Sequence, residues 1–301
     1  MLSRKNKLLI QKGFSLFSVV RGYNILVIVL AQYLTSVYIL APELPMRHVL
    51  FDLNLLMLVL ASSAAIAGGY IINNFYDSEK DLINRPRKSM LDRLVSQRTK
   101  LTVYFVLNFL SAVFASYVSF RAVVFFSIYI FGIWLYSHKL KRIGFLGNLT
   151  AAVLSVIPFF AVFIYYKNFD TVIFVHATFL FLVLLIREMV KDLENLKGDL
   201  TLNYKTIPVL YGEGIAKKAI CFLVLITLVP TYLLLYKFEI GYMHYYFYAA
   251  LLLLMVFLGI LLRANKKLHY IALHTILKLI IVIGVFSIVL IDVDFILRRF
   301  I

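Results

Sequence analysis

The sequence predicts an all-α integral membrane protein that crosses the bilayer nine times and forms a single domain over residues 1–301. Hydrophobic residues make up 62% of the 301 residues and the mean hydropathy is +0.91, which is too apolar for a soluble domain of this length. Apolar runs of about 18 to 25 residues recur along the chain, and each can span a hydrocarbon core of roughly 30 Å. Strand-like alternation is absent, so the runs are expected to be helices. We expect spans at about residues 16–40, 50–74, 100–119, 122–137, 144–166, 171–190, 215–237, 243–263 and 270–296.

Lysine and arginine are distributed unevenly between the loops. The N-terminal part and the loops after even-numbered spans hold 24 of the 31 Lys and Arg residues, whereas the odd-numbered loops and the C-terminal end hold 6. The remaining one, Lys278, lies inside the ninth span, where it either snorkels to the interface or faces an internal cavity. The positive-inside rule therefore places the N-terminus and the even-numbered loops in the cytoplasm. We expect a multi-pass protein of the bacterial inner membrane.

The composition does not indicate a nucleic-acid-binding protein, a disulfide-linked protein or a cleaved signal peptide. The net charge of +16 is explained by this topology, and no aromatic-basic motif accompanies it, so nucleic acid is not an expected partner. The single cysteine, Cys221, lies in an apolar span and can form no internal disulfide. The basic N-terminal segment resembles a signal peptide, but its apolar stretch is long and no small-residue cleavage site ends it. We therefore interpret it as the first anchored span.

Two polar clusters close apolar runs. In the first, Asn73, Asp77 and Asp81 fall at i, i+4 and i+8 and share a face if the helix continues. Asn74 lies beside them. The second cluster repeats the spacing of three and then four residues at the end of the sixth span, and its members are Asp192, Asn195 and Asp199. Both clusters precede basic residues and a proline, and both are expected on the cytoplasmic side. We therefore expect one site built from two halves.

These clusters suit a divalent cation and a polyphosphate. Mg²⁺ prefers oxygen ligands and is commonly held by one or two carboxylates together with substrate phosphates. Basic residues lie next to the clusters in the sequence and are suited to neutralise a leaving diphosphate: Arg85, Lys88, Lys191 and Lys205. The long polar connections at about 75–99 and 187–214 follow the clusters and are expected to cap the site. A diphosphate at the membrane surface implies a lipid tail between the helices.

The same residues carry a resemblance to a known family. The chain resembles the UbiA superfamily of intramembrane prenyltransferases over nearly its full length. The matching stretches run from Gly69 through Asn73-Asn74-Phe75-Tyr76-Asp77 to Pro86, and from Lys191 to Asp199, followed by Lys205 to Pro208 and Gly212. Weaker matches are Arg21 and Asn24, Tyr136-Ser137 with Lys139 and Lys141, and Asn148.

The resemblance implies nine transmembrane helices around a central cavity and a Mg²⁺-dependent transfer of a polyprenyl group from a prenyl diphosphate. Carried over to this chain, it implies catalytic roles for Asp77, Asp81, Asp192 and Asp199. The implied metal ligands are these four with Asn74 and Asn195. The implied substrate-binding residues are Arg21, Asn24, Asn73, Arg85, Tyr136, Lys139, Lys191 and Lys205.

The sequence also departs from the pattern of the family. Asn74 and Asn195 stand where the family usually has aspartate, so each cluster has one negative charge less and metal affinity should be lower. An alternative function is therefore a weakened or inactive member that binds a lipid or a membrane-protein partner. A secondary transporter would need polar groups at midplane and ranks last. The acceptor stays open between an aromatic quinone or pigment precursor and a prenylglycerol phosphate. His138, His176, His244, His269 and His274 lack metal spacing and are expected to be non-catalytic.

Overall fold

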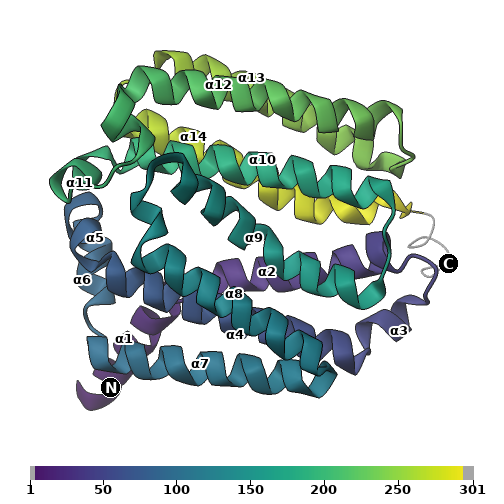
Figure 1. The fold of residues 1–301 in the computed structure, drawn as a ribbon, viewed down its shortest axis with the longest axis horizontal. Helices are drawn as coiled ribbons and strands as arrows, with labels where there is room; N and C mark the ends of the chain where they lie inside the picture. The colour runs from purple at the N-terminus through teal and green to yellow at the C-terminus, as the bar shows by residue number, and fades with distance from the viewer. Residues whose placement is uncertain (1–3, 294–301) are drawn as a thin grey trace. The chain divides into compact units, whose positions relative to one another are not determined.

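The structure, a computed structural model, describes residues 4–293 and is almost wholly helical over that range (Figure 1). Nine helical segments of these residues are long and apolar enough to cross a membrane, as predicted: Gly22–Leu40, Leu53–Tyr76, Gln97–Val118, Phe120–Arg142, Gly144–Tyr166, Thr171–Glu194, Ile207–Tyr236, Gly241–Arg263 and Lys267–Ile291. The protein is therefore an all-α, multi-pass integral membrane protein.

The helices run in the following order. They are α1 Arg4–Val19, α2 Gly22–Thr35, η1 Ser36–Leu40, α3 Met46–Leu50, α4 Leu53–Tyr76, α5 Ser78–Asn84, α6 Pro86–Asp92, α7 Gln97–Val118, α8 Phe120–His138, η2 Leu140–Arg142, α9 Gly144–Tyr166, α10 Thr171–Glu194, α11 Leu196–Thr201, α12 Ile207–Tyr236, η3 Gly241–Met243, α13 His244–Arg263, α14 Lys267–Ser287 and η4 Ile288–Ile291. The long polar connections that the sequence predicted as caps thus contain the short helices α5, α6 and α11.

The chain divides into two compact units. Of the described residues, unit 1 comprises 4–29, 52–141 and 197–203, and unit 2 comprises 30–51, 142–196 and 204–293. Helix α2 crosses from the first unit to the second, and the segment 197–203 returns the chain to unit 1 for most of α11. The prediction of a single domain is not tested by this division and stays a prediction.

Unit 1 is built on α4, which packs against α7 and α8 (Figure 1). A run of small buried residues on α4 lets α7 approach closely. Ser111 of α7 donates a hydrogen bond to the carbonyl oxygen of Ala61 at 2.9 Å, and a side chain at Gly68 would meet Asn108 Oδ1 at 2.8 Å. Ile71 and Ile72 continue this core toward the end of α4. The polar C-terminal end of α4 therefore follows a part of the helix that is tightly packed against α7.

Side-chain caps fix where the spans of unit 1 begin. The Asp52 carboxylate accepts from the Asn54 backbone N–H at 2.9 Å at the start of α4. Ser96 accepts from the Thr99 N–H at 3.1 Å at the start of α7. Ser119 does the same for Ala122 and so sets the short turn between α7 and α8. Each such cap is worth about 1 kcal/mol.

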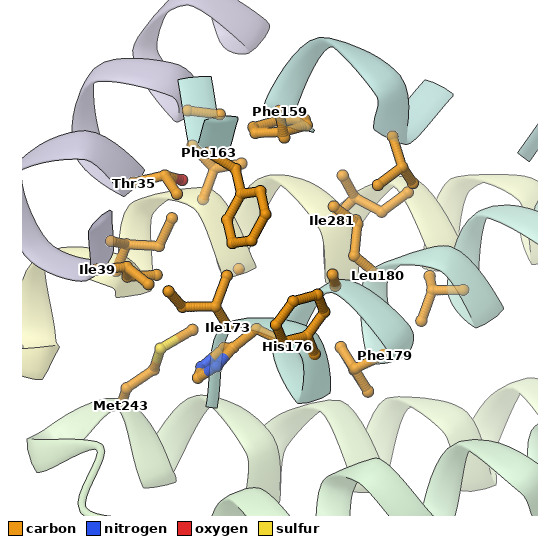
Figure 2. Close-up of a pocket in the computed structure, with 18 of the residues that line it drawn as sticks. Thr35, Ile39, Phe159, Phe163, Ile173, His176, Phe179, Leu180, Met243 and Ile281 are labelled. Carbon is orange, nitrogen blue, oxygen red and sulfur yellow. The ribbon is translucent and has the colours of Figure 1, made fainter. Parts of the chain in front are cut away.

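Unit 2 is centred on α10, which packs against α9, α12 and α14, while α13 packs against α12 and α14 (Figure 1). The N-terminal half of α10 borders an apolar cavity of about 140 Å³. Phe163, Ile173, Leu180 and Ile281 surround it, and His176 lies at its edge (Figure 2). The C-terminal end of α10 is polar and carries the second predicted cluster.

Candidate active site

The first cluster lies where α4 ends and α5 begins. Asp77 is the residue between the two helices, with φ −90° and ψ 4°. The helical hydrogen bonds nevertheless continue through it, because Asp77 N–H donates to the Asn73 carbonyl at 2.9 Å and Asp81 N–H donates to the Asp77 carbonyl at 2.8 Å. The predicted stripe at i, i+4 and i+8 is therefore kept across a slight break in the helix.

Asp77 is held by a lysine from the loop after α8. Lys141 Nζ lies 2.6 Å from Asp77 Oδ1 and 3.4 Å from Asn73 Oδ1, and its side chain is 6% exposed. Lys139, which the sequence singled out instead, is exposed, and its role in substrate binding stays a prediction. The 3₁₀ turn Leu140–Arg142 directs the later lysine to the cluster.

Three cations lie close enough to Asp81 for their charges to act on it. Burial raises the pKa of its carboxyl group, and the nearby Asp77 carboxylate raises it further, while Lys88, Arg85 and Arg21 act in the opposite direction. The pKa of Lys88 is lowered, first by burial and then by the charge of Arg21. Three basic side chains thus lie around one acidic group, and this arrangement suits an anionic ligand that adds negative charge.

Arg21 reaches this neighbourhood from the break between α1 and α2. Its backbone is left-handed, with φ 50°, a conformation that is costly for a residue other than glycine. The guanidinium carbon lies 5.0 Å from the centre of the Tyr70 ring, and Asn24 donates to the Tyr70 hydroxyl at 3.3 Å. Tyr70, on α4, therefore positions both residues that the sequence predicted in the first span.

Asp199 of the second cluster lies beside the first cluster within unit 1. Its carboxylate is fully buried and is paired with Lys80 of α5. The preceding Gly198 N–H donates to Asn84 Oδ1 at 3.1 Å, and a side chain at Gly198 would clash with the Asn84 amide at 2.4 Å. Two segments that are more than a hundred residues apart in the chain are thus brought together, as the sequence predicted for part of the two-halved site.

The Asn74 side chain contacts other protein side chains, whereas the sequence predicted that it binds a metal ion. Its Nδ2 donates to Asp92 Oδ2 at 3.0 Å, and its Oδ1 accepts from Lys100 Nζ at 2.8 Å. Asp92 and Lys100 are 3% and 2% exposed. Both ends of the Asn74 amide are therefore engaged in a buried network that also contains a full carboxylate. Its role as a metal ligand stays a prediction.

The rest of the second cluster lies at the end of α10 in unit 2. Asp192 Oδ2 accepts from Asn148 Nδ2 of α9 at 2.8 Å. Asn195 is buried and ends the helix through its N–H, which donates to the Lys191 carbonyl at 3.0 Å. Lys191 itself donates to Glu188 Oε2 at 2.8 Å.

The remaining predicted substrate-binding residues are placed as follows. The backbone of Lys205 pairs with Arg142 and Gly144 at 2.9 and 2.6 Å, while its side chain is exposed. Tyr136 is half-buried on α8. Arg85 ends α5, close enough for its charge to act on Asp81. The roles of these three residues in substrate binding stay predictions.

Comparison with known proteins identifies the family. Residues 23–288 match the UbiA prenyltransferase family. The chain belongs to this family. Its relatives include the digeranylgeranylglyceryl phosphate synthases of Thermococcus gammatolerans, 32% identical over 60% of this chain and 64% of that protein, and of Methanobrevibacter smithii, 27% identical over 82% and 87%. The first match thus spans just under two thirds of the relative's length.

Solved structures show the same fold. A digeranylgeranylglyceryl phosphate synthase has a TM-score of 0.70 at 20% identity and covers 93% of this chain and 98% of that one. A UbiA homolog from Archaeoglobus fulgidus bound to GPP and Mg²⁺ has a TM-score of 0.67 at 14% identity and covers 91% and 99%. The predicted UbiA resemblance is confirmed, and so is the class of enzyme at the level of the family, a prenyltransferase that transfers alkyl groups.

The residues of this UbiA protein fit a magnesium ion that is shared with a substrate. Over residues 4–293, no three Asp, Glu, His or Cys side chains gather closely enough to hold a metal by themselves. Instead, Asp77 and Asp199 are each neutralised by a lysine, Lys141 and Lys80. Mg²⁺ usually keeps several waters and takes only one or two protein carboxylates besides phosphate oxygens. Carboxylates that already attract cations, with further cations close by for phosphate, match this requirement.

Sequence reasoning missed several residues of this neighbourhood. They are Lys80, Asp92 and Lys100. Lys88, Lys141 and Asn148 were named from the sequence, but the contacts of Lys141 with Asp77 and of Asn148 with Asp192 were not predicted. Lys80 could have been found as a basic residue within four positions of a motif residue. Asp92 and Lys100 gave no such indication, because they resemble ordinary charges in a cytoplasmic loop and at the start of a span.

Proposed function

We propose that this UbiA protein transfers a prenyl group from a prenyl diphosphate to an acceptor in a magnesium-dependent reaction. The observation that carries the proposal is the interleaving of carboxylates and cations in unit 1, where Asp77 and Asp199 are paired with lysines and Asp81 lies among Arg21, Arg85 and Lys88. The homolog of known structure that was bound to GPP and Mg²⁺ supports it.

In this proposal the residues of unit 1 hold and neutralise the leaving group. Asp77, Asp81 and Asp199 would hold magnesium, which supplies positive charge to the diphosphate when bound. Lys141 and Lys80 would exchange their carboxylate partners for phosphate oxygens, and Arg21 and Arg85 would add positive charge to the same group. The C–O bond between the allylic carbon and the diphosphate breaks, the acceptor hydroxyl oxygen forms the new bond to that carbon, and the hydroxyl proton is released together with the diphosphate.

We propose a glyceryl phosphate that already carries one prenyl chain as the acceptor. Relatives from several organisms are named digeranylgeranylglyceryl phosphate synthase, and that product is a glyceryl phosphate with two such chains. The aromatic acceptor is the alternative. The purified protein, incubated with geranylgeranyl diphosphate and both classes of acceptor, should yield the two-chain glyceryl phosphate by mass spectrometry. Prenylation of the aromatic compounds alone would contradict this choice.

The apolar cavity of unit 2 is proposed to take the far end of the prenyl chain. Ala177, which lines it, lies fifteen residues before Asp192 on α10, a distance of about 22 Å along the helix. Only a long isoprenoid can reach that far from the second cluster. The volume of about 140 Å³ is close to that of a cavity of about 150 Å³ known to bind benzene in another protein, and the aromatic and aliphatic walls suit one isoprene unit (Figure 2).

Filling this cavity should shorten the chain that the enzyme prefers. Ala177→Phe is expected to lower kcat/KM for geranylgeranyl diphosphate by roughly 10-fold or more relative to geranyl diphosphate, because the last isoprene unit loses its space. Competition between the two donors, followed by product analysis, measures the ratio. The neighbouring Thr178 is exposed, so Thr178→Phe is the matched control and should leave the ratio unchanged. An unchanged ratio in Ala177→Phe would place the chain elsewhere.

The alternative function is lipid binding by a catalytically weakened or inactive member of the family. The two asparagines at motif positions motivate it, and a thermal-shift measurement separates the two cases. Stabilisation by prenyl diphosphate that requires Mg²⁺, accompanied by turnover, supports the enzyme, whereas lipid binding without turnover supports the alternative. We place the site on the cytoplasmic side because of the uneven Lys and Arg distribution. The bacterial inner membrane and a protein partner stay predictions.

A further inference from the structure

Helices α1 and α6 of unit 1 lie outside the membrane spans and lead directly into them. Two residues separate α1 from α2, where the first span begins at Gly22, and four residues separate α6 from α7. The two helices contact each other at the end of unit 1 where α7 begins (Figure 1). Ser15 Oγ of α1 donates to the Leu91 carbonyl of α6 at 2.8 Å. They therefore form one surface next to the ends of these spans.

The polarity of this surface is the reverse of that on a soluble protein. Polar side chains of both helices face the protein, because Ser15 and Asp92 are each 3% exposed. Large apolar side chains face outward, with Phe14 73% exposed and Met90 62% exposed. A helix in contact with water normally buries its apolar side and exposes its polar side. The outward side of α1 and α6 is therefore suited to a partly apolar surrounding.

The exposed charges on the same surface are all positive. Over residues 11–20 and 86–99, the exposed charged side chains are Lys12, Arg87, Arg93 and Arg98. The one acidic residue in these stretches, Asp92, is buried and accepts from the Asn74 amide at 3.0 Å, so it adds no exposed negative charge. At the start of α1 the sequence adds three more basic residues, Arg4, Lys5 and Lys7. The surface is therefore suited to an anionic partner.

A membrane surface with anionic lipids fits this combination of side chains better than hydrocarbon or a second copy of the chain. The apolar side chains of an interfacial helix enter the boundary between headgroups and acyl chains, while its basic side chains reach the phosphates. Arg87, Met90 and Leu91, at i, i+3 and i+4, share one side of α6 and can make both contacts. Arginine is costly within hydrocarbon, and a second copy would bring the same positive charge to the contact.

We infer that the α1–α6 surface, defined as the exposed side chains of α1 and α6 together with Arg93 and Arg98, binds the headgroup layer of a membrane that contains anionic lipids. This surface lies outside the proposed active site, and its lipid contacts do not depend on the proposed function. Arg21 follows α1 after one intervening residue. Lipid that holds α1 in place therefore also holds the chain next to the candidate site.

The reactivity of single cysteines in lipid nanodiscs tests this contact. Phe14→Cys and Met90→Cys are each made in a Cys221→Ser background, and single copies are placed in discs of phosphatidylcholine or of an equal mixture with phosphatidylglycerol. An uncharged, water-soluble maleimide is expected to react with either cysteine at least about 10-fold more slowly in the mixed discs, because anionic lipid attracts nearby basic residues to the surface. Asn265→Cys, in the exposed connection between α13 and α14, is the control and should react equally fast in both discs.

Charge variants then show whether the basic residues cause this protection. The combined change Lys12→Gln, Arg87→Gln and Arg98→Gln is expected to remove most of the difference between the two kinds of disc. The combined change Lys218→Gln, Arg263→Gln and Lys266→Gln removes the same charge from exposed positions of unit 2 and should leave the difference intact. Salt at about 1 M should also reduce the difference, and this measurement needs no charge variant.

Three results would overturn the lipid contact. Reaction at positions 14 and 90 as fast as at position 265 in both kinds of disc would mean that the surface stands in water. Slow reaction of equal rate in both kinds of disc would mean apolar contact without recognition of charge. Protection that appears only when two copies share a disc would make the surface an interface between copies of the chain.

Discussion

Replacing Asp77 by alanine is expected to abolish magnesium-dependent prenyl transfer, with a loss of roughly 100- to 1,000-fold or more in kcat, as for other groups that position transition-state charge. Asp77 lies at the break between α4 and α5, where its carboxylate is aimed at Lys141. Without it, the proposed site loses both a magnesium ligand and the group that holds this lysine in place. Turnover of labelled geranylgeranyl diphosphate by the purified variant gives the measurement, and Asp192→Ala should lose turnover to a similar extent.

Stability must be measured alongside turnover, because Asp77→Ala leaves Lys141 buried without its carboxylate. Breaking such a buried pair costs about 3–5 kcal/mol, so inactivity could reflect unfolding. Asp77→Asn keeps a hydrogen-bond acceptor for Lys141, and Asp77→Ala combined with Lys141→Ala removes both charges. We expect all three variants to be inactive and the last two to melt close to the unmodified protein. Full turnover in a folded Asp77→Ala and Asp192→Ala double variant would refute the assigned roles.

The sequence was sufficient to predict the membrane spans and the shared face of the first cluster, because both depend on local patterns. Apolar runs predict the helices directly, and the spacing of Asn73, Asp77 and Asp81 predicts a shared face that the structure retains through the break at Asp77. The approach of Asp199 to the first cluster was predicted from the repeated spacing and from the expected cytoplasmic location of both clusters. In the structure this approach depends on Gly198, where a side chain would collide with Asn84.

The contacts of the site were harder to predict, because they depend on tertiary packing. Lys139 and Lys141 are equivalent in the sequence, and only the 3₁₀ turn after α8 decides that the second reaches Asp77. His274 was expected to be non-catalytic because it lacks metal spacing, and this stays a prediction. Its partner Glu194 lies 80 positions away, so no local pattern could reveal the pair.

Asn74 shows how a departure from the family pattern can be understood in this structure. The family usually has aspartate at this position, and the loss of charge suggested weakened metal binding. In the structure, however, the Asn74 amide bonds to a carboxylate, Asp92, and to Lys100 at 3.0 and 2.8 Å. The negative charge is thus present within the network, on α6 instead of α4, and the amide connects it to the motif.

Exchanging Asn74 and Asp92 should therefore reduce stability and turnover less than changing either residue alone. Asn74→Asp places a second carboxylate about 3 Å from Asp92, and Asp92→Asn leaves Lys100, which is 2% exposed, without its neighbouring negative charge. Each single variant is expected to lose on the order of 3 kcal/mol of stability and at least about 10-fold in turnover. The double variant Asn74→Asp with Asp92→Asn restores one amide, one carboxylate and one lysine in hydrogen-bond contact.

Thermal unfolding and Mg²⁺ titration of the four proteins test this exchange. The double variant should recover most of the melting temperature and bind Mg²⁺ at least as tightly as the unmodified protein, because the carboxylate then stands on α4 beside Asp77. The two single changes must be strongly non-additive, with a coupling of about 1–3 kcal/mol, as expected for residues within one network. Simple additivity would mean that Asn74 and Asp92 act independently, and the shared-charge explanation of the altered motif would be wrong.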